Sequence, residues 1–115
     1  MDAVHHFIDI YVTFLIFRYK LVEILLLYMC YYVYIIKSEH KGLFYYGQTQ
    51  DLQSRIAYHN KGYSRFTKSH LPWILFAYKK FGSRAEAMKT ERKLKNIKSK
   101  EKVTVFINKK GFTIV

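Results

Sequence analysis

Apolar and aromatic residues fall into short runs that polar segments separate. Residues 31–37 (YYVYIIK) and 43–49 (LFYYGQT) are rich in aromatic and β-branched residues, which is typical of strands. The polar segment 38–42 (SEHKG) between them predicts a turn, so the two strands should form an antiparallel hairpin. A third strand is expected near residues 73–81, after a polar loop.

Two helices are predicted in the same part of the chain. Asp51 is a good N-cap for a helix that runs to about Asn60, and Gly62 can supply the left-handed residue that ends it. Residues 83–86 (SRAE) form a capping box at the start of a second helix, which should run to roughly Ile97. The order β-β-α-β-α therefore predicts one α+β unit.

The two ends of the chain lie outside this unit, which occupies residues 29–98. Residues 1–28 are largely apolar, but three charged residues between positions 18 and 23 interrupt them, so no charge-free run reaches the ~20 residues of a membrane-spanning helix. We expect an extension there, either a loose helix or the product of an upstream start codon, with a weakly membrane-associated helix as the alternative.

Residues 99–115 form a basic and apolar tail that predicts a small hairpin around residues 108–111.

Positive charge is concentrated in the folded part. The chain holds 20 Lys+Arg against 8 Asp+Glu, a formal net charge of +12. Residues 1–36 carry two basic and three acidic residues, whereas residues 37–115 carry 18 basic and five acidic residues, a net of +13. A compact module with such an excess attracts polyanions, most commonly nucleic acid. The competing interpretation is an ordinary solvated, lysine-rich surface.

Cys30 is the single cysteine of the chain. It therefore excludes an internal disulfide and a Cys-based zinc site. The five histidines are scattered, and the adjacent pair His5 and His6 lies in the N-terminal extension, where we assign it no metal role. The composition favours a reducing, cytoplasmic compartment.

One basic residue interrupts the apolar side of the first predicted helix. Leu52, Ile56 and His59 share a face at helical spacing, and Arg55 lies between the first two on the same side. Such an arginine either extends its charged end into water or is directed at an anion.

One acidic residue interrupts the second helix in the same way. Ala87, Met88 and Leu94 lie one turn from Glu91, so this carboxylate faces the core side. A carboxylate there costs free energy unless a cation satisfies it. Two interpretations remain open, an ion pair with an arginine of the first helix or a metal ligand.

The hairpin brings tyrosines together. If Lys37 pairs with Gly42, the register places Tyr34 directly opposite Tyr45, with both side chains on one face. Gly47 lies on the same face and leaves a gap beside them, where a ligand or a helix backbone could approach. Paired aromatic residues are also common structural features of sheets.

Four segments in order give the chain a family resemblance. YVY (32–34), YYG (45–47), DLQSRIAYHNKG (51–62) and EAMKTERKLK (86–95) resemble the motifs of the GIY-YIG nuclease domain. The resemblance covers residues 31–97 and is greatest to the small stand-alone members, which are similar to the N-terminal nuclease domain of an excinuclease. It implies a small three-stranded antiparallel sheet flanked by helices.

The resemblance assigns roles to five residues. Tyr34 matches the tyrosine of the first triplet, and Tyr45 matches the first tyrosine of the second triplet. Arg55 matches the helix arginine, His59 the histidine one turn later, and Glu91 the metal-binding glutamate. All five are therefore expected to be catalytic.

The chain departs from the family pattern at three places, none of which removes a catalytic position. The first triplet has Tyr32 and Val33 where the family has a glycine and its neighbour. Tyr46 replaces the isoleucine of the second triplet. The late asparagine of some members has Asn96 as its nearest match.

The resemblance implies a metal-dependent DNA endonuclease that hydrolyses phosphodiester bonds, structure-selective or of low specificity, with a role in DNA repair or processing. One Mg²⁺ (or Mn²⁺) held by Glu91 is the implied cofactor, with no small-molecule cofactor, and RNA is the alternative substrate. Arg55 would bind the phosphate, and Tyr34, Tyr45 and His59 would orient and deprotonate water. Nine basic residues are the candidates for contacts with backbone phosphates: Lys61, Arg65, Lys68, Lys79, Lys80, Lys89, Arg92, Lys93 and Lys95.

Two other functions fit parts of the sequence. A catalytically inactive nucleic-acid-binding module would explain the charge and the aromatic residues, but binding does not require an acid on an apolar helix face. A membrane-surface protein would pair the basic domain with an amphipathic anchor in residues 1–28.

Overall fold

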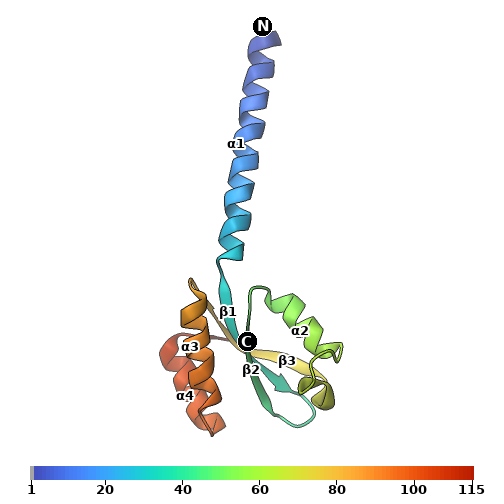
Figure 1. Cartoon of the computed structure of the whole chain (residues 1–115), viewed down its shortest axis with the longest axis vertical. Helices are drawn as coiled ribbons and strands as arrows, with labels where there is room; N and C mark the ends of the chain where they lie inside the picture. The colour runs from blue at the N-terminus through green and yellow to red at the C-terminus, as the bar shows by residue number, and fades with distance from the viewer. Residues whose placement is uncertain (1) are drawn as a thin grey trace.

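The computed structural model describes residues 2–115, which form a small α+β domain with a long N-terminal helix (Figure 1). The elements in chain order are α1 (Asp2–Tyr28), β1 (Tyr31–Ser38), β2 (Phe44–Thr49), α2 (Leu52–Asn60), the short 3-10 helix η1 (Thr67–His70), β3 (Trp73–Phe81), α3 (Arg84–Lys95), α4 (Lys100–Lys110) and β4 (Thr113–Ile114). The α+β fold with an antiparallel sheet flanked by helices is confirmed.

The sheet has four strands in the order β2-β1-β3-β4, all antiparallel to their neighbours. The three predicted strands form its centre and one edge. The fourth strand, β4, is a short addition from the C-terminal tail that pairs with β3.

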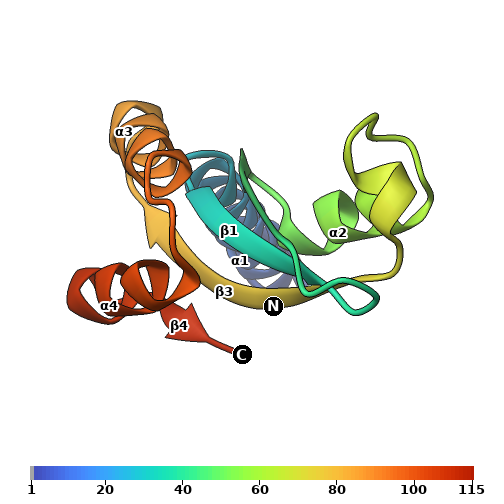
Figure 2. The ribbon, with the colours of Figure 1, turned by 90° about the horizontal axis from the view of Figure 1, so that it is seen from below.

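Helices cover both faces of the sheet (Figure 2). On one face, α2 packs through its apolar residues against a cluster centred on Tyr34, Ile36 and Trp73. On the other face, α3 and α4 pack against alternate residues of the same strands. This second cluster consists of Val33, Ile35, Ala77, Ala87, Leu94, Val103, Ile107 and Phe112. Because side chains alternate along a strand, β1 serves both clusters.

The register of the hairpin differs from the prediction. Tyr34 pairs with Gly47, and Tyr45 pairs with Ile36. The reason is the turn, in which the Ser38 amide donates to the carbonyl of Leu43, so that the centre of the turn lies one residue later than the sequence suggested. The ladder is shifted by two residues, so Tyr34 and Tyr45 still lie on one face as diagonal neighbours rather than opposite each other.

The C-terminal tail is a helix, so the predicted hairpin around residues 108–111 is wrong. Ser99 caps α4 by accepting a hydrogen bond from the Lys102 amide at 3.1 Å. Gly111 ends it with φ of +79°, a conformation that glycine adopts readily. The buried residues Val103 and Ile107 lie one turn apart and face the sheet. Burial of this apolar face outweighs the weak alternation that suggested strands.

Helix α1 extends away from the domain and ends near the first strand (Figure 1). Large apolar side chains are exposed along its whole length, with Phe7 and Tyr19 both 72% exposed. Among the helices of the described residues, none combines the length and the apolar character that crossing a membrane requires.

Candidate active site

A buried phenol at the centre of the sheet forms the core of the site. Tyr34 lies on β1, is 1% exposed, and its hydroxyl is 2.8 Å from Nε2 of His59 on α2. Arg55, one turn earlier on α2, donates from Nε to the same hydroxyl at 3.3 Å. The helix N-cap Asp51 sets this geometry, because it starts α2 where both side chains face the sheet.

The imidazole is held from both sides. His59 is completely buried, and its Nδ1 is 2.8 Å from the hydroxyl of Thr67 on η1. Thr67 in turn accepts a hydrogen bond at its carbonyl from the indole Nε1 of Trp73, also at 2.8 Å. A neutral imidazole carries one donor and one acceptor, so these two partners fix the ring between Tyr34 and Thr67.

Burial and a neighbouring cation determine the protonation states. Desolvation, followed by the positive charge of Arg55, lowers the pKa of His59 to about 4, so the ring is neutral near pH 7. Desolvation raises the pKa of Tyr34, and the nearby charges of Tyr45 and Glu91 raise it further. The hydrogen bond and charge of Arg55 oppose this increase. Arg55 is thus the main group in the described chain that favours the phenolate.

Gly47 makes room for this phenol. It pairs with Tyr34 in the sheet, and a Cβ at this position would overlap the Tyr34 hydroxyl oxygen. The gap that the sequence predicted is therefore real, but the ring of Tyr34 fills it rather than a ligand or a helix backbone. Any larger residue at position 47 would displace the phenol.

Tyr45 completes the aromatic surroundings at the edge of the site. Its ring meets the ring of His59 edge-on at a centroid distance of 5.0 Å and stacks on Phe66 at 5.9 Å. The guanidinium of Arg55 lies over the ring of Tyr58, 4.6 Å from its centroid. The structure therefore brings together four of the five predicted residues, Tyr34, Tyr45, Arg55 and His59.

Glu91 lies on α3 and lines a separate hollow. The hollow has a volume of about 240 Å³, and its lining residues are Gln48, Met88, Glu91, Arg92 and Lys95. The Glu91 side chain is 13% exposed and pairs with Lys95 at 2.7 Å, one turn along the helix. The ion pair considered from sequence therefore forms within α3 rather than with Arg55. The charge of Glu91 contributes to raising the pKa of Tyr34, although α3 packs against the opposite face of the sheet from α2.

Of the described residues, Glu91 is the one acidic side chain that lines this hollow. Within residues 2–115, no cluster of three or more His, Cys, Asp and Glu side chains is placed to bind a metal. Mg²⁺ does not require one, since it binds through one or two carboxylates, waters and substrate phosphates. Glu91 offers such a carboxylate, and Gln48 lines the same hollow with an amide oxygen.

The nine predicted phosphate-binding residues fall into three regions. Three of them lie within residues 61–68, from the end of α2 into η1. Four line a second hollow of about 380 Å³ together with a lysine that the sequence did not suggest: Lys79, Lys80, Lys89, Lys93 and Lys110. The remaining two, Arg92 and Lys95, lie beside Glu91. Positive charge therefore borders α3 on two of its faces.

Sequence reasoning missed the residues that hold the side chains of the candidate site. Thr67 lies in a polar loop with no pattern to distinguish it, and its role depends on η1 folding back onto α2. Tyr58 and Phe66 carry aromatic rings at exposed positions, where the sequence gives no sign of which neighbour each will contact.

A phenol, an imidazole and a guanidinium that meet on one face of an antiparallel sheet are suited to phosphate-ester chemistry. Residues 30–104 match the family model of the GIY-YIG catalytic domain, and the chain belongs to this family. The match covers every residue of the candidate site and the first part of α4, and it begins after α1. Membership in this family of nuclease domains indicates endonuclease activity.

Small bacterial and archaeal proteins are similar to the chain. A UPF0213 protein of Staphylococcus haemolyticus is 37% identical over 73 residues, which are 63% of this chain and 88% of the relative. A UPF0213 protein of Halobacterium salinarum is 34% identical over 76 residues, 65% of this chain and 97% of the relative. The solution structure of a UPF0213 protein from Bacillus halodurans is 34% identical, covers 72% of this chain and 87% of that chain, and has a TM-score of 0.46.

Proposed function

We propose that the protein is a metal-dependent DNA endonuclease, structure-selective or of low sequence specificity, that acts in DNA repair or processing. The observation that carries this proposal is the buried hydrogen bond between Tyr34 and His59, with Arg55 on the same hydroxyl. A purely structural tyrosine requires neither a neutral imidazole nor a guanidinium at its oxygen. Together these groups provide a proton acceptor next to an anion-binding side chain.

Arg55 is the phosphate ligand in this proposal. Its guanidinium is held in place by Tyr34 and by the face of Tyr58, which reduces the entropy lost on binding. The side chain is partly exposed, unlike Tyr34 and His59. A planar guanidinium can bind two oxygens of a phosphate and stabilise the charge that develops there during hydrolysis.

Tyr34 and His59 form the proton path. Nε2 of neutral His59 accepts the hydroxyl proton of Tyr34 while the phenol oxygen accepts a proton from the attacking water. The imidazolium formed in this step keeps an N–H toward Thr67. A phosphate bound to Arg55 would offset the positive charge that lowers the pKa of His59, so substrate binding itself makes His59 a better acceptor. Tyr45 orients the water at the edge of the site.

Glu91 is the metal ligand, with one Mg²⁺ (or Mn²⁺) and with Gln48 near enough to share the site. The ion, when bound, supplies Lewis-acid stabilisation of the phosphoryl oxygens. Lys95 holds the carboxylate until then, and release of this ion pair is part of the cost of loading the site. The other basic residues bind backbone phosphates without reading sequence.

The test is cleavage of supercoiled and branched DNA by the purified full chain with Mg²⁺ or Mn²⁺. We expect nicking that EDTA abolishes, and Arg55→Ala should lose cleavage with only a modest loss of DNA affinity. Lys93→Ala is the control for removal of one positive charge. It should weaken binding slightly and reduce its salt dependence, while the chemical step continues. Binding without cleavage of any DNA or RNA by the parent protein would instead identify a binding module.

A further inference from the structure

One face of α3 carries a row of functional side chains. Arg84, Met88, Glu91 and Lys95 follow one another at the spacing that places residues on a single helical face. All four line hollows that also include Gln48 of the edge strand β2. A groove therefore runs along α3 beside the edge of the sheet.

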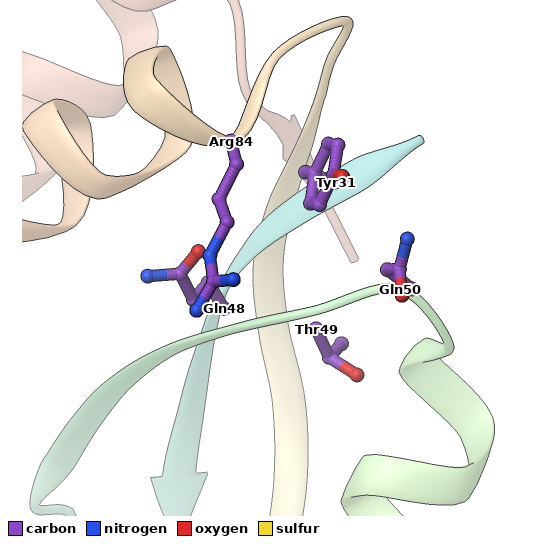
Figure 3. A pocket seen from close by; sticks show the side chains of 5 residues that line it. All are labelled: Tyr31, Gln48, Thr49, Gln50 and Arg84. Carbon is purple, nitrogen blue, oxygen red and sulfur yellow. The ribbon is translucent and has the colours of Figure 1, made fainter. Parts of the chain in front are cut away.

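Two hollows make up this groove, and Gln48 lines both. The hollow at the Glu91 end is the one that Met88, Glu91, Arg92 and Lys95 line. The hollow at the start of α3 has a volume of about 360 Å³, and its lining residues are Tyr31, Gln48, Thr49, Gln50 and Arg84. Figure 3 shows Arg84 reaching from the start of α3 toward Gln48, with the ring of Tyr31 standing on β1 above the chain of β2. None of the described residues that line this hollow is acidic.

The chemistry of the hollow at the start of α3 suits a nucleotide. A tyrosine ring provides a surface on which any base can stack. Amide and guanidinium side chains are the groups that bond to base edges and phosphates. Arg84 is exposed and free to do so, because the one ion pair among the described residues joins Lys95 and Glu91.

The hollow at the start of α3 lies within a few nucleotides' length of Glu91, the proposed metal ligand. Arg84 precedes Glu91 by seven residues, about 10 Å along the helix axis. About three nucleotides of one strand span this length at ~3.4 Å each. A base within a duplex has neighbours on both faces and could not stack on Tyr31, whereas an unpaired base could.

We propose that Tyr31, Gln48 and Arg84 form a subsite for an unpaired nucleotide close to the scissile phosphate, so that the substrate is a strand with single-stranded character beside the cut. This proposal rests on the proposed endonuclease function. It adds a substrate class, namely flaps, forks and single strands in preference to uninterrupted duplex.

Binding without cleavage tests the subsite directly. Oligonucleotides carrying the fluorescent base 2-aminopurine, either unpaired in a flap or within a duplex, would be titrated with the full chain in EDTA. We expect Arg84→Ala to weaken binding of the flap about tenfold, the effect of one guanidinium contact to a base or phosphate. The duplex should lose less than about twofold. Lys102→Ala removes the same charge from an exposed position on α4 and should affect both substrates equally and weakly.

A stacked base gives a second readout. The 2-aminopurine in the flap should be quenched on binding to the parent protein, and Tyr31→Leu should reduce this quenching while circular dichroism confirms the fold. The subsite would be overturned if Arg84→Ala weakened binding of flap and duplex equally, or if it weakened flap binding no more than Lys102→Ala does. In that case, cleavage by the parent protein would still support the endonuclease function. A parent protein that neither cuts nor binds would overturn both.

Discussion

At the scale of single residues, the site depends on a completely buried histidine. His59 bonds to Tyr34 on one side and to Thr67 on the other, each at 2.8 Å. A buried polar network of this kind is stable only when every member has a partner. Removal of the imidazole would leave the Thr67 hydroxyl without a partner and the Tyr34 hydroxyl with Arg55 alone, at a cost of about 1–3 kcal/mol for each unsatisfied group. The network therefore holds the Tyr34 phenol in place and supports the fold at the same time.

The low pKa of His59 predicts that the folded state loses stability in mild acid. The pKa is about 4 in the folded protein against an ordinary value of 6.5. Between these values the unfolded chain binds a proton that the folded chain does not, so the free energy of unfolding falls as the pH decreases through this window. Urea unfolding at pH 7.5 and pH 4.5 should differ by about 2 kcal/mol.

The control for this measurement is His59→Gln, which has no group that titrates in the window. This variant should be less stable than the parent at pH 7.5 and should change much less between the two pH values. An equal change in both proteins would assign the acid sensitivity to other groups.

At the scale of elements, the helix starts could be predicted from the sequence, whereas the strand register and the packing of α4 could not. Asp51 caps α2 as predicted, and Ser83 caps α3 through the Glu86 amide at 3.2 Å. Both caps depend on residues within one turn. The hairpin register depends on hydrogen bonds inside the turn, and α4 depends on burial of Val103 and Ile107 against a sheet formed far earlier in the chain. Such contacts leave little trace in local sequence.

The same distinction applies to the candidate site. Arg55 and Glu91 stand out because each breaks the apolar pattern of its helix. The roles of Tyr34 and His59 followed from the family resemblance, and their hydrogen bond needed the packing of α2 on the sheet. The groove beside α3 could not be predicted, since it arises where a helix and an edge strand meet.

Helix α4 is part of the core, so shortening one of its buried side chains should destabilise the fold. Ile107 is 0% exposed and packs in the cluster beneath the sheet. Ile107→Ala should lower the free energy of unfolding by about 2–4 kcal/mol, because it leaves a cavity. Val105→Ala is the matched control on the same helix, where the side chain is 59% exposed and the change should stay within about 0.5 kcal/mol. Similar effects in urea unfolding of the two variants would mean that α4 does not pack as described.

At the scale of the whole molecule, the protein consists of a basic domain and a projecting apolar helix. The molecule is 70 Å long, and the 27 residues of α1 account for about 40 Å of this length. The family match begins at residue 30, directly after α1. Both apolar clusters of the core lie entirely within the later residues. We therefore propose residues 1–28 as an extension that the domain does not need in order to fold.

Deletion of residues 1–28 tests this proposal. The shortened chain should fold, and its free energy of unfolding should lie within a few kcal/mol of the value for the full chain, since few contacts are lost. The hydrogen bond from the Gln50 amide to the carbonyl of Tyr28 is one of them. Urea unfolding of both proteins, followed by circular dichroism, measures the difference. Failure of the shortened chain to fold would show that α1 contributes to the core.

The central claim is that Glu91 belongs to a metal-dependent nuclease site with Tyr34, His59 and Arg55. Its most direct test compares cleavage of supercoiled DNA in Mg²⁺ by Glu91→Gln with cleavage by Glu86→Gln, which removes an exposed carboxylate from the same helix. We predict that Glu91→Gln abolishes cleavage while retaining DNA binding, because the lysines that hold phosphates are unchanged, and that Glu86→Gln cuts as the parent does. Cleavage by Glu91→Gln at the parent rate would contradict the account.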